Sequence, residues 1–344
     1  MTDTRKPKRF NSGIRVSSVC AFGSVMESEG PCGKLLDGTV KDTPDDGETW
    51  EKAESSMISR TVGRLLEKCG RSDRETELLL GGDLMNQCTS CAYGLEGFDI
   101  PYLGLYGACS TFALGVMTAS AYIESGFCSN AIACASSHFC TAERQYRFPL
   151  SYGAFPQGTS QHTVTGCGAA FLEKAENKSG GVYVSAALPG IVINRGITNA
   201  SNMGAAMASA AADTIMRYLI HTHTRLCDYD LVATGDLGSI GLEMAKDIMK
   251  SHGFTDECGV MSDCGCMIYD LNEQEVSCGG SGCGCSAVTF CSYIYDRLIK
   301  KHYKRVLLIG TGAMMSPQSL MQGLSIPAVA HLVEFESGLL EERV

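Results

Sequence analysis

The chain has 344 residues, of which 44% are hydrophobic and 19% charged, and its formal net charge at pH 7 is −10. This is an ordinary globular composition in a chain long enough for two halves with a joint core. The acidic charge argues against nucleic acid as a partner, and no apolar run reaches the roughly 18 residues that span a bilayer. Because the N-terminus also lacks the apolar core of a secretory signal, the sequence predicts a soluble protein.

Cysteine is abundant, with 18 residues in the chain. Without a secretory signal, this number indicates reduced thiols in a cytosol-like compartment. The C-x-x-C pair Cys88 and Cys91 has no histidine at a zinc-site spacing. We therefore expect no bound metal, and we interpret most of the cysteines as small buried apolar side chains.

In chain order, residues 1–48 have no regular pattern and carry turn residues. Residues 49–69 have the spacing of a helix with one apolar face. A buried strand is predicted within 76–81, and a second short buried strand at 101–106 leads into a turn at Cys109.

The pattern Gly107-Ala108-Cys109-Ser110 nearly recurs as Cys283-Gly284-Cys285-Ser286. Each copy opens a run of small and apolar residues at helical spacing, and a β-rich run follows, at 131–134 and at 306–310.

A second pair of landmarks supports the same reading. An alanine-rich helix is expected at 205–220, and the strand at 231–233 ends in Gly235-Asp236-Leu237, which repeats Gly82-Asp83-Leu84. We infer a duplicated supersecondary unit.

The predicted fold is therefore α/β, with two similar halves at 1–190 and 191–344. Alternating strands and helices imply a mainly parallel sheet covered on both faces in each half, which gives an α/β/α/β/α body. The poorly periodic block 137–165 is interpreted as a functional loop insertion. Residues 256–278 are interpreted as an insertion in the second half.

The strand-to-helix turn at Cys109 is the candidate site. A helix N-terminus exposes unpaired N–H groups and partial positive charge, both of which would lower the pKa of a cysteine there. Such a thiol suits nucleophilic acyl transfer, and the same turn suits binding of an anion without chemistry. A buried structural cysteine is the alternative.

The remaining candidates come from neighbouring loop ends. An acyl-transfer cysteine needs a base and an oxyanion hole, for which His138 and His331 are candidates. The turn 279–282 should face Cys109 by pseudo-symmetry. Arg144 and Arg147 could bind a carboxylate or pair with acids on the surface.

Four acidic residues and one asparagine leave further alternatives open. Asp83, together with Asn86, could line the cavity or cap a turn. Asp236, its symmetry mate, is interpreted as structural. Glu143 and Asp263 are possible contacts if a ligand enters as its calcium chelate.

At these residues the chain resembles known proteins. The turn into Cys109, the Gly-rich turn at 279–284, the strand at 165–170 and the duplication resemble the thiolase and ketoacyl-synthase superfamily, with Cys109 on the nucleophile position. A closer resemblance, to the stage V sporulation protein AD family, runs through ordered motifs along nearly the whole chain: residues 30–33, 82–87, 107–111, 136–147, 210–214, 262–265, 279–283, 311–317 and 325–331.

This resemblance implies a thiolase-like fold and a protein of spore-forming bacteria that binds dipicolinic acid (pyridine-2,6-dicarboxylate). It implies support for uptake of that ligand into the developing spore, beside the membrane subunits of the SpoVA complex. The implied location is the forespore or spore, peripheral to the inner membrane, and superfamily members are commonly homodimers.

The chain departs from the enzyme pattern of the superfamily, because the late turn Gly280-Ser281-Gly282-Cys283 holds neither the expected histidine nor asparagine. We therefore favour a former enzyme pocket that now binds a ligand and needs no cofactor. The alternative is an active acyltransferase or condensing enzyme that uses Cys109 and a coenzyme A thioester. The residues predicted to bind the ligand are Cys109, His138, Arg144, Arg147, Asp83, Asn86, Ser281, Cys283 and His331.

Overall fold

The computed structural model describes residues 5–41, 49–146, 156–175 and 180–338, which are built around one mixed sheet. Its strands run in the order β10-β9-β12-β13-β8-β1-β7-β5-β3-β4, and β2 pairs with β1. Their bounds in chain order are β1 Lys8–Ser24, β2 Gly38–Val40, β3 Leu79–Gly82, β4 Tyr102–Gly104, β5 Asn130–Ser137, β7 Gly166–Lys174, β8 Val182–Leu188, β9 Leu231–Thr234, β10 Met261–Asp263, β12 Arg305–Ala313 and β13 Ala328–Ser337. A separate two-stranded ladder pairs β6 (His162–Thr163) with β11 (Gly280–Ser281).

The strand pairings confirm the predicted duplication. In the first half β1, β7 and β5 pair antiparallel, and β5, β3 and β4 follow in parallel. In the second half β8, β13 and β12 pair antiparallel, and β12, β9 and β10 follow in parallel. The expectation of a mainly parallel sheet is therefore wrong, because the strands nearest the pseudo-twofold axis alternate in direction. By this pairing β8 belongs with the second half, although it precedes residue 190.

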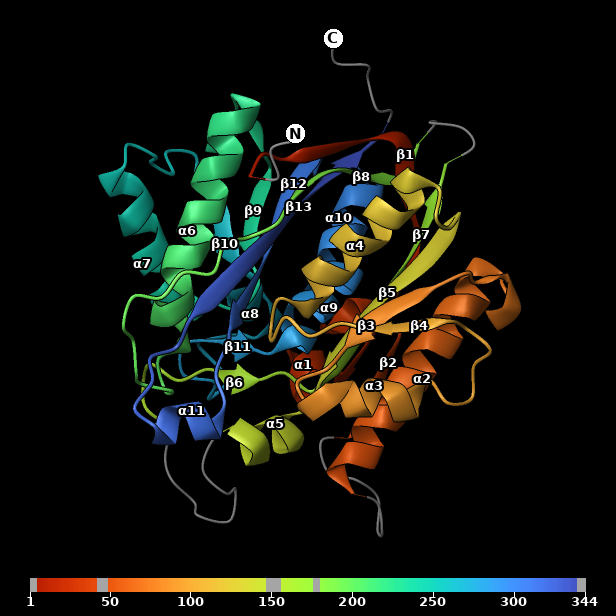
Figure 1. Ribbon diagram of the computed structural model, residues 1–344, viewed down its shortest axis with the longest axis horizontal. Helices are drawn as coiled ribbons and strands as arrows, with labels where there is room; N and C mark the ends of the chain where they lie inside the picture. The colour runs from red at the N-terminus through yellow and green to blue at the C-terminus, as the bar shows by residue number, and fades with distance from the viewer. Residues whose placement is uncertain (1–4, 42–48, 147–155, 176–179, 339–344) are drawn as a thin grey trace.

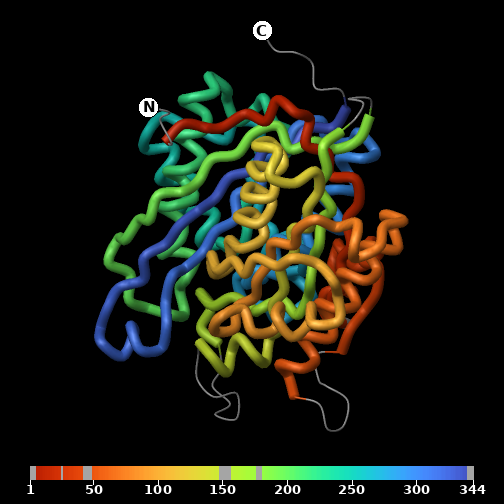
Figure 2. Tube along the Cα trace, turned by 45° about the vertical axis from the view of Figure 1, so that its right-hand side comes forward, coloured from red at the N-terminus to blue at the C-terminus, as the bar shows by residue number. Residues whose placement is uncertain are grey.

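Helices complete five layers, as predicted. The central layer contains α4 (Thr111–Ser125) and α9 (Cys283–Thr289), which lie between the two half-sheets. One outer layer is α2 (Trp50–Cys69) with α3 (Thr89–Gly94), and the other is α6 (Met203–Thr222) with α7 (Gly238–Ser251). Figure 1 shows these outer pairs on opposite sides of the sheet, and the same segments lie apart in the turned view of Figure 2. The shorter helices are α1 Val25–Glu29, α5 Phe139–Tyr146, α8 Cys264–Ile268, α10 Tyr295–Ile299 and α11 Pro317–Met321.

The hydrophobic core follows the layers. The central cluster joins both halves, and within it the rings of Phe112 in α4 and Phe290, directly after α9, lie 5.6 Å apart between centroids. Separate clusters lie under α2 and under α6. α4 is apolar or small on nearly every side because sheet covers it on two faces, whereas α2 shows one apolar stripe.

Several sequence expectations about elements need correction. Residues 1–48 contain the long strand β1, whose serines hide its alternating pattern. The strand at 101–106 is not buried, because β4 lies at the sheet edge and Leu103 is 39% exposed. The block 137–165 contains α5 and β6. The predicted insertion 256–278 contains β10, which takes the place in the second half that β4 has in the first.

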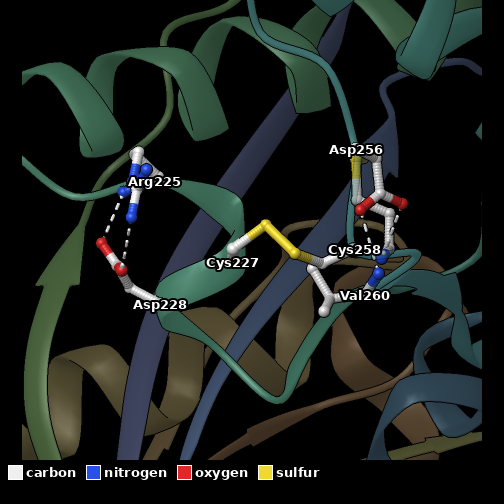
Figure 3. The surroundings of a disulfide bond; sticks show 7 residues. Arg225, Cys227, Asp228, Asp256, Cys258 and Val260 are labelled. Carbon is white, nitrogen blue, oxygen red and sulfur yellow. Dashed lines mark hydrogen bonds and ion pairs between the residues drawn. A yellow bond between two sulfur atoms is a disulfide. The ribbon is translucent and has the colours of Figure 1, made fainter.

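The cysteine prediction is also wrong at one pair. Cys227 and Cys258 form a disulfide with Cα atoms 5.6 Å apart, on the exposed side of the second half (Figure 3). The other 16 cysteines are free, and most of them are buried, which agrees with their interpretation as small apolar side chains.

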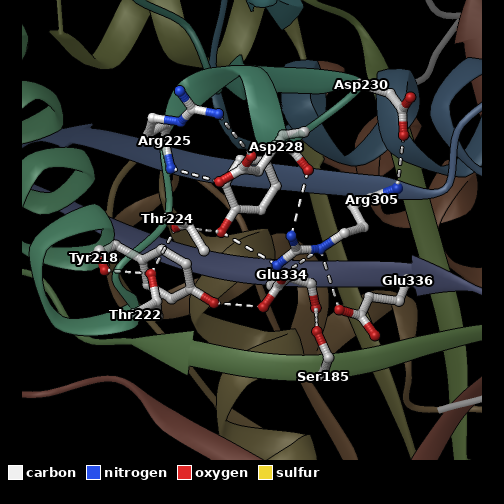
Figure 4. A network of polar contacts seen from close by, with 11 residues as sticks. Ser185, Tyr218, Thr222, Thr224, Arg225, Asp228, Asp230, Arg305, Glu334 and Glu336 are labelled. Atoms are coloured by element: carbon white, nitrogen blue, oxygen red, sulfur yellow. Dashed lines mark hydrogen bonds and ion pairs between the residues drawn. The ribbon is translucent and has the colours of Figure 1, made fainter. Parts of the chain in front are cut away.

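A buried polar network ties α6 to the sheet (Figure 4). Glu334 of β13 is fully buried, accepts a hydrogen bond from Tyr218 Oη at 2.5 Å, and pairs with Arg305 of β12 at the same distance. Arg305 also pairs with Glu336 at 3.3 Å. Because each charge has a partner, the network satisfies groups that would otherwise be costly to bury. Among the helices of the described ranges, none has the length and apolar character needed to cross a membrane.

Candidate functional site

Cys109 lies in a sharp turn between β4 and α4, at the centre of the molecule. Ala108 has a φ of 49°, and the turn is closed by hydrogen bonds from Ser110 Oγ to the Gly107 carbonyl (2.6 Å) and from Thr111 Oγ1 to the Ala108 carbonyl (2.7 Å). β12 packs directly on this turn, since a Cβ atom on Gly312 would come within 2.3 Å of the Gly107 carbonyl oxygen. The turn therefore holds the thiol in one place, 6% exposed as a residue.

A small cavity of about 40 Å³ opens beside the thiol. Its walls are mainly apolar, and its polar members are two phenols, a thiol, two hydroxyls and one carboxylate. The described lining residues are Leu84, Tyr106, Ala108, Cys109, Ala142, Glu143, Tyr146, Thr163, Met203, Ser281, Ala313 and Met315. None of these described residues is a lysine, arginine or histidine.

An outer groove of about 360 Å³ adjoins this cavity. The two spaces share Tyr106, Tyr146 and Met315. The phenol oxygens of Tyr106 and Tyr146 lie 2.6 Å apart, and Tyr146 Oη also donates to the Leu84 carbonyl at 2.5 Å. The tyrosine pair thus stands between the buried thiol and the groove at the surface.

The late Gly-rich turn faces Cys109, as pseudo-symmetry predicted. The Gly282 N–H and the Ser281 side chain interact with the thiol, and both would stabilise its ionised form. Burial and the neighbouring Asp236 carboxylate outweigh them and raise the pKa of Cys109 well above its ordinary value of 9.0. The expected lowering of this pKa by a helix N-terminus is therefore wrong.

Asp236 is a neighbour of Cys109 that the sequence analysis does not place at the site. The sequence predicts a structural role for this residue, whereas in the structure its side chain interacts with the Cys109 thiol. Its Oδ2 accepts from the Gly282 N–H at 3.0 Å and its Oδ1 from Thr311 Oγ1 at 2.7 Å. Burial raises its pKa from 3.8 to about 7. The repeated Gly-Asp-Leu pattern was the available signal, but it could not tell which of the two aspartates turns inward.

The structure brings together only some of the predicted site residues. Ser281 lines the cavity, and Cys283 is buried behind it with its thiol donating to the Ser136 carbonyl at 2.8 Å. Asn86 lines the outer groove, where its side chain accepts from Gln145 Nε2 at 3.3 Å. Asp83 instead accepts from the backbone N–H groups of Met85 and Cys91, which is the turn-capping alternative.

The predicted basic residues lie elsewhere. Arg144 pairs with Glu51 and stacks over Trp50, 5.0 Å from the ring centroid, which is the surface ion-pair alternative. Arg147 lies outside the described residues. His138 is buried, and its Nδ1 accepts from the Cys140 N–H at 3.2 Å in the first turn of α5.

His331 on β13 accepts from the Gly190 N–H at 3.2 Å, and burial lowers its pKa to about 4. Neither His138 nor His331 is among the described residues that line the cavity.

Of the two residues considered as calcium contacts, only one lies at the cavity. Glu143 of α5 lines the cavity and accepts from Thr163 Oγ1 at 3.1 Å. Asp263 instead accepts from the N–H groups of Leu237, Gly238 and Gly265, which begin α7 and α8.

Comparison with known proteins identifies the family. The sequence profile of stage V sporulation protein AD (SpoVAD) matches residues 4–336. The stage V sporulation protein AD of Bacillus subtilis (strain 168) is 39% identical over 328 residues, which cover 95% of each chain. The chain belongs to the stage V sporulation protein AD family. Membership makes it a sporulation protein.

Comparison with solved structures shows which fold this chain has. The 3-oxoacyl-[acyl-carrier-protein] synthase III of Aquifex aeolicus superposes with a TM-score of 0.57 at 11% identity, over 94% of this chain and 100% of that one. OleA of Xanthomonas campestris gives 0.60 at 11% identity over 95% and 99%. Human mitochondrial 3-ketoacyl-CoA thiolase gives 0.58 at 10% identity over 97% and 100%. The fold is thiolase-like.

Proposed function

We propose that this protein binds dipicolinic acid in the space formed by the Cys109 cavity and its outer groove, and supports uptake of that ligand into the developing spore. The observation that carries the proposal is that the buried Cys109 thiol, with the Asp236 carboxylate acting on it, lines a cavity whose described lining has no histidine. A thiol with a raised pKa and no imidazole beside it is a poor acyl-transfer nucleophile. Family membership then favours binding of a ligand over catalysis.

The chemistry of the lining favours the calcium chelate of dipicolinate over the free dianion. The described walls contribute the Glu143 carboxylate, Asp236 lies close behind, and no described lining residue is cationic. The free dipicolinate dianion would be repelled by these carboxylates in a partly buried space. Calcium bound by the ligand would neutralise it and would accept Glu143 Oε atoms as further hard oxygen ligands.

The shape of the site suits a flat aromatic ring. Leu84, Met203 and Met315 supply apolar contact, and the rings of Tyr106 and Tyr146 stand at the junction of the two spaces. The inner cavity of about 40 Å³ is smaller than such a ligand. Binding therefore requires the two phenols to separate so that the ligand occupies the cavity and part of the groove.

Calorimetric titration tests this function. We expect saturable binding of dipicolinate with calcium, weaker binding with a chelator present, and no binding of benzene-1,3-dicarboxylate, which lacks the ring nitrogen. Glu143→Gln should remove most of the gain from calcium. Arg144→Ala is the matched control on the same helix and should leave the affinity unchanged. Absence of saturable dipicolinate binding under both conditions contradicts the proposal.

The alternative function is acyl transfer by Cys109. It has a separate readout, because an acyl-coenzyme A donor would leave a thioester adduct visible by intact mass. We expect no adduct. An adduct that disappears in Cys109→Ala would establish the enzyme instead.

Two associations belong to the same proposal. We expect a homodimer, because β4 ends the sheet and leaves the side chain of Leu103 exposed at that edge. Light scattering after size exclusion checks the mass, and Leu103→Asp should shift it toward the monomer.

We also expect the protein to work at the spore inner membrane beside the SpoVA membrane subunits, as the family resemblance implies. Co-purification with those subunits tests it.

A further inference from the structure

One short segment, residues 84–88, forms a wall of both spaces at the site. Leu84 lines the inner cavity, and Asn86 and Gln87 line the outer groove. Leu84 is buried, whereas Asn86 and Gln87 are exposed. Because the inner cavity of about 40 Å³ is smaller than a ring with two carboxylates, a wall must move before such a ligand enters. Displacement of this segment would widen both spaces at once.

The backbone of this segment is strained. Gln87 and Cys88 are consecutive non-glycine residues in the left-handed region, with φ of 66° and 54°. Such residues persist only where surrounding contacts hold them. At the start of the segment Asp83 Oδ1 accepts from the Met85 N–H at 2.8 Å, and at its end the Cys88 thiol donates to the Leu105 carbonyl at 3.3 Å. The exposed middle is held from across the groove.

Gln145, in the last turn of α5, makes three hydrogen bonds to this segment. Its Oε1 accepts from the Asn86 N–H at 3.2 Å, and its Nε2 donates to the Leu84 carbonyl at 3.0 Å and to Asn86 Oδ1 at 3.3 Å. Tyr146 Oη donates to the same Leu84 carbonyl at 2.5 Å. Since the Tyr146 proton is used there, Tyr106 Oη is the donor in the 2.6 Å contact between the two phenols.

α5 itself is fixed to the body of the protein. Its Thr141 Oγ1 donates to the buried Glu54 carboxylate at 2.9 Å, and its Phe139 N–H donates to Thr165 Oγ1 at the same distance. Displacement of α5 would break these hydrogen bonds in the interior, where water does not replace them. Displacement of the exposed part of the 84–88 segment breaks hydrogen bonds at the surface. The segment is therefore the side of the groove that yields.

We propose that residues 84–88 are the movable wall of the site and that Gln145 is the latch that holds this wall closed. When the Gln145 bonds break, Gln87 can leave the left-handed region, so relief of backbone strain favours the open wall. Opening also takes the Leu84 carbonyl away from Tyr146, which allows the two phenols to separate. The inference rests on the proposed function only in taking the cavity as the place that the ligand enters, and its test needs no ligand.

The test is the access of a thiol reagent to Cys109. Wild-type protein and variants are treated with N-ethylmaleimide at one alkaline pH, and the labelled Cys109 peptide is quantified by mass spectrometry. In Gln145→Ala the labelling rate should rise about tenfold, because three hydrogen bonds of modest net strength no longer oppose opening. A labelling rate equal to that of wild type overturns the inference.

Two further variants separate the latch from general loosening of the fold. Arg144→Ala is the matched control, because it shortens the neighbouring side chain of the same helix, whose ion pair is with Glu51. Its Cys109 labelling rate should equal that of wild type. Gln87→Gly tests the strain, since glycine adopts a positive φ without steric cost and should stabilise the closed wall. Its rate should fall below that of wild type. A rise in the labelling rate of either variant overturns the inference.

Hydrogen–deuterium exchange gives a readout that does not depend on Cys109. The Asn86 N–H donates to Gln145 when the wall is closed, so its exchange should be about tenfold faster in Gln145→Ala than in wild type. The N–H groups of α5 should exchange equally in both proteins. Unchanged exchange at Asn86, or faster exchange along α5, overturns the inference. If dipicolinate does not bind but these results hold, the proposed ligand is wrong and the latch stands.

Discussion

At the scale of single residues, the buried carboxylate of Glu54 is stabilised by hydroxyl groups. Glu54 of α2 is 1% exposed and accepts hydrogen bonds from Ser90 (3.2 Å), Ser136 (3.0 Å) and Thr141 (2.9 Å). Burial first, and then the Asp83 carboxylate, raise its pKa from 4.5 to about 8. Glu54 thus joins α2, α3, β5 and α5 through a side chain that is neutral at moderate pH.

This environment predicts how stability depends on pH. Because the folded-state pKa lies above the unfolded value, the stabilising contribution of Glu54 is complete below about 4.5 and is lost as the pH rises through about 8. Each unit of difference is worth about 1.4 kcal/mol, so the full loss is on the order of a few kcal/mol. Glu54→Gln should flatten the pH dependence of the free energy of unfolding, measured by urea at pH 5, 7 and 8.5.

Glu243→Gln supplies the matched control, since its side chain is 71% exposed. It should leave the slope with pH unchanged. A Glu54→Gln protein that loses stability between pH 5 and 8 as steeply as wild type would show that another group carries the effect.

At the scale of elements, the disulfide ties two segments on the outside of the second half. Cys227 lies in the short helix Leu226–Asp228 before β9, and Cys258 precedes β10, 31 residues away in sequence. Asp256 holds the same loop by accepting from the N–H groups of Val260 and Met261, as Figure 3 shows in part. The bond therefore fixes the entry to the edge strand of the second half.

Loss of this disulfide should destabilise the fold without touching the cavity. Closing a loop of this length stabilises a protein by about 4 kcal/mol. We expect dithiothreitol to lower the Tm of wild type, a Cys227→Ser, Cys258→Ser double variant to have that lower Tm, and the reductant to have no effect on the variant. Equal Tm values for wild type with and without reductant would mean that the bond does not form in solution.

At the scale of the whole molecule, the two halves share one central layer and should unfold together. Phe290 is fully buried between the half-sheets and packs on Phe112 and on Phe335, whose ring centroid is 4.3 Å away. Phe290→Ala should cost about 3–5 kcal/mol, measured by urea unfolding with both circular dichroism and tyrosine fluorescence.

The two probes should give coincident transitions, since neither half keeps a closed core alone. Phe127→Ala is the control, because that side chain is 71% exposed and should change stability by less than about 0.5 kcal/mol. Separate transitions for the two probes would contradict a shared core.

The sequence alone determined the elements whose signal is local. The repeated Gly-Asp-Leu and Cys-Ser patterns predicted the duplication, and apolar periodicity predicted α2, α6, β3 and β9, because each of these signals needs only neighbours along the chain. Ordered motifs along the chain likewise predicted the family and the thiolase-like fold.

The tertiary structure decided what depends on partners far apart in sequence. It placed β1 where the first half meets the second, made β4 an edge strand, turned Asp236 toward Cys109, and paired Arg144 with Glu51. Burial and the charges brought together by folding set the pKa of a thiol and the partner of a guanidinium. Those quantities are properties of the packed molecule, which the order of residues along the chain does not display.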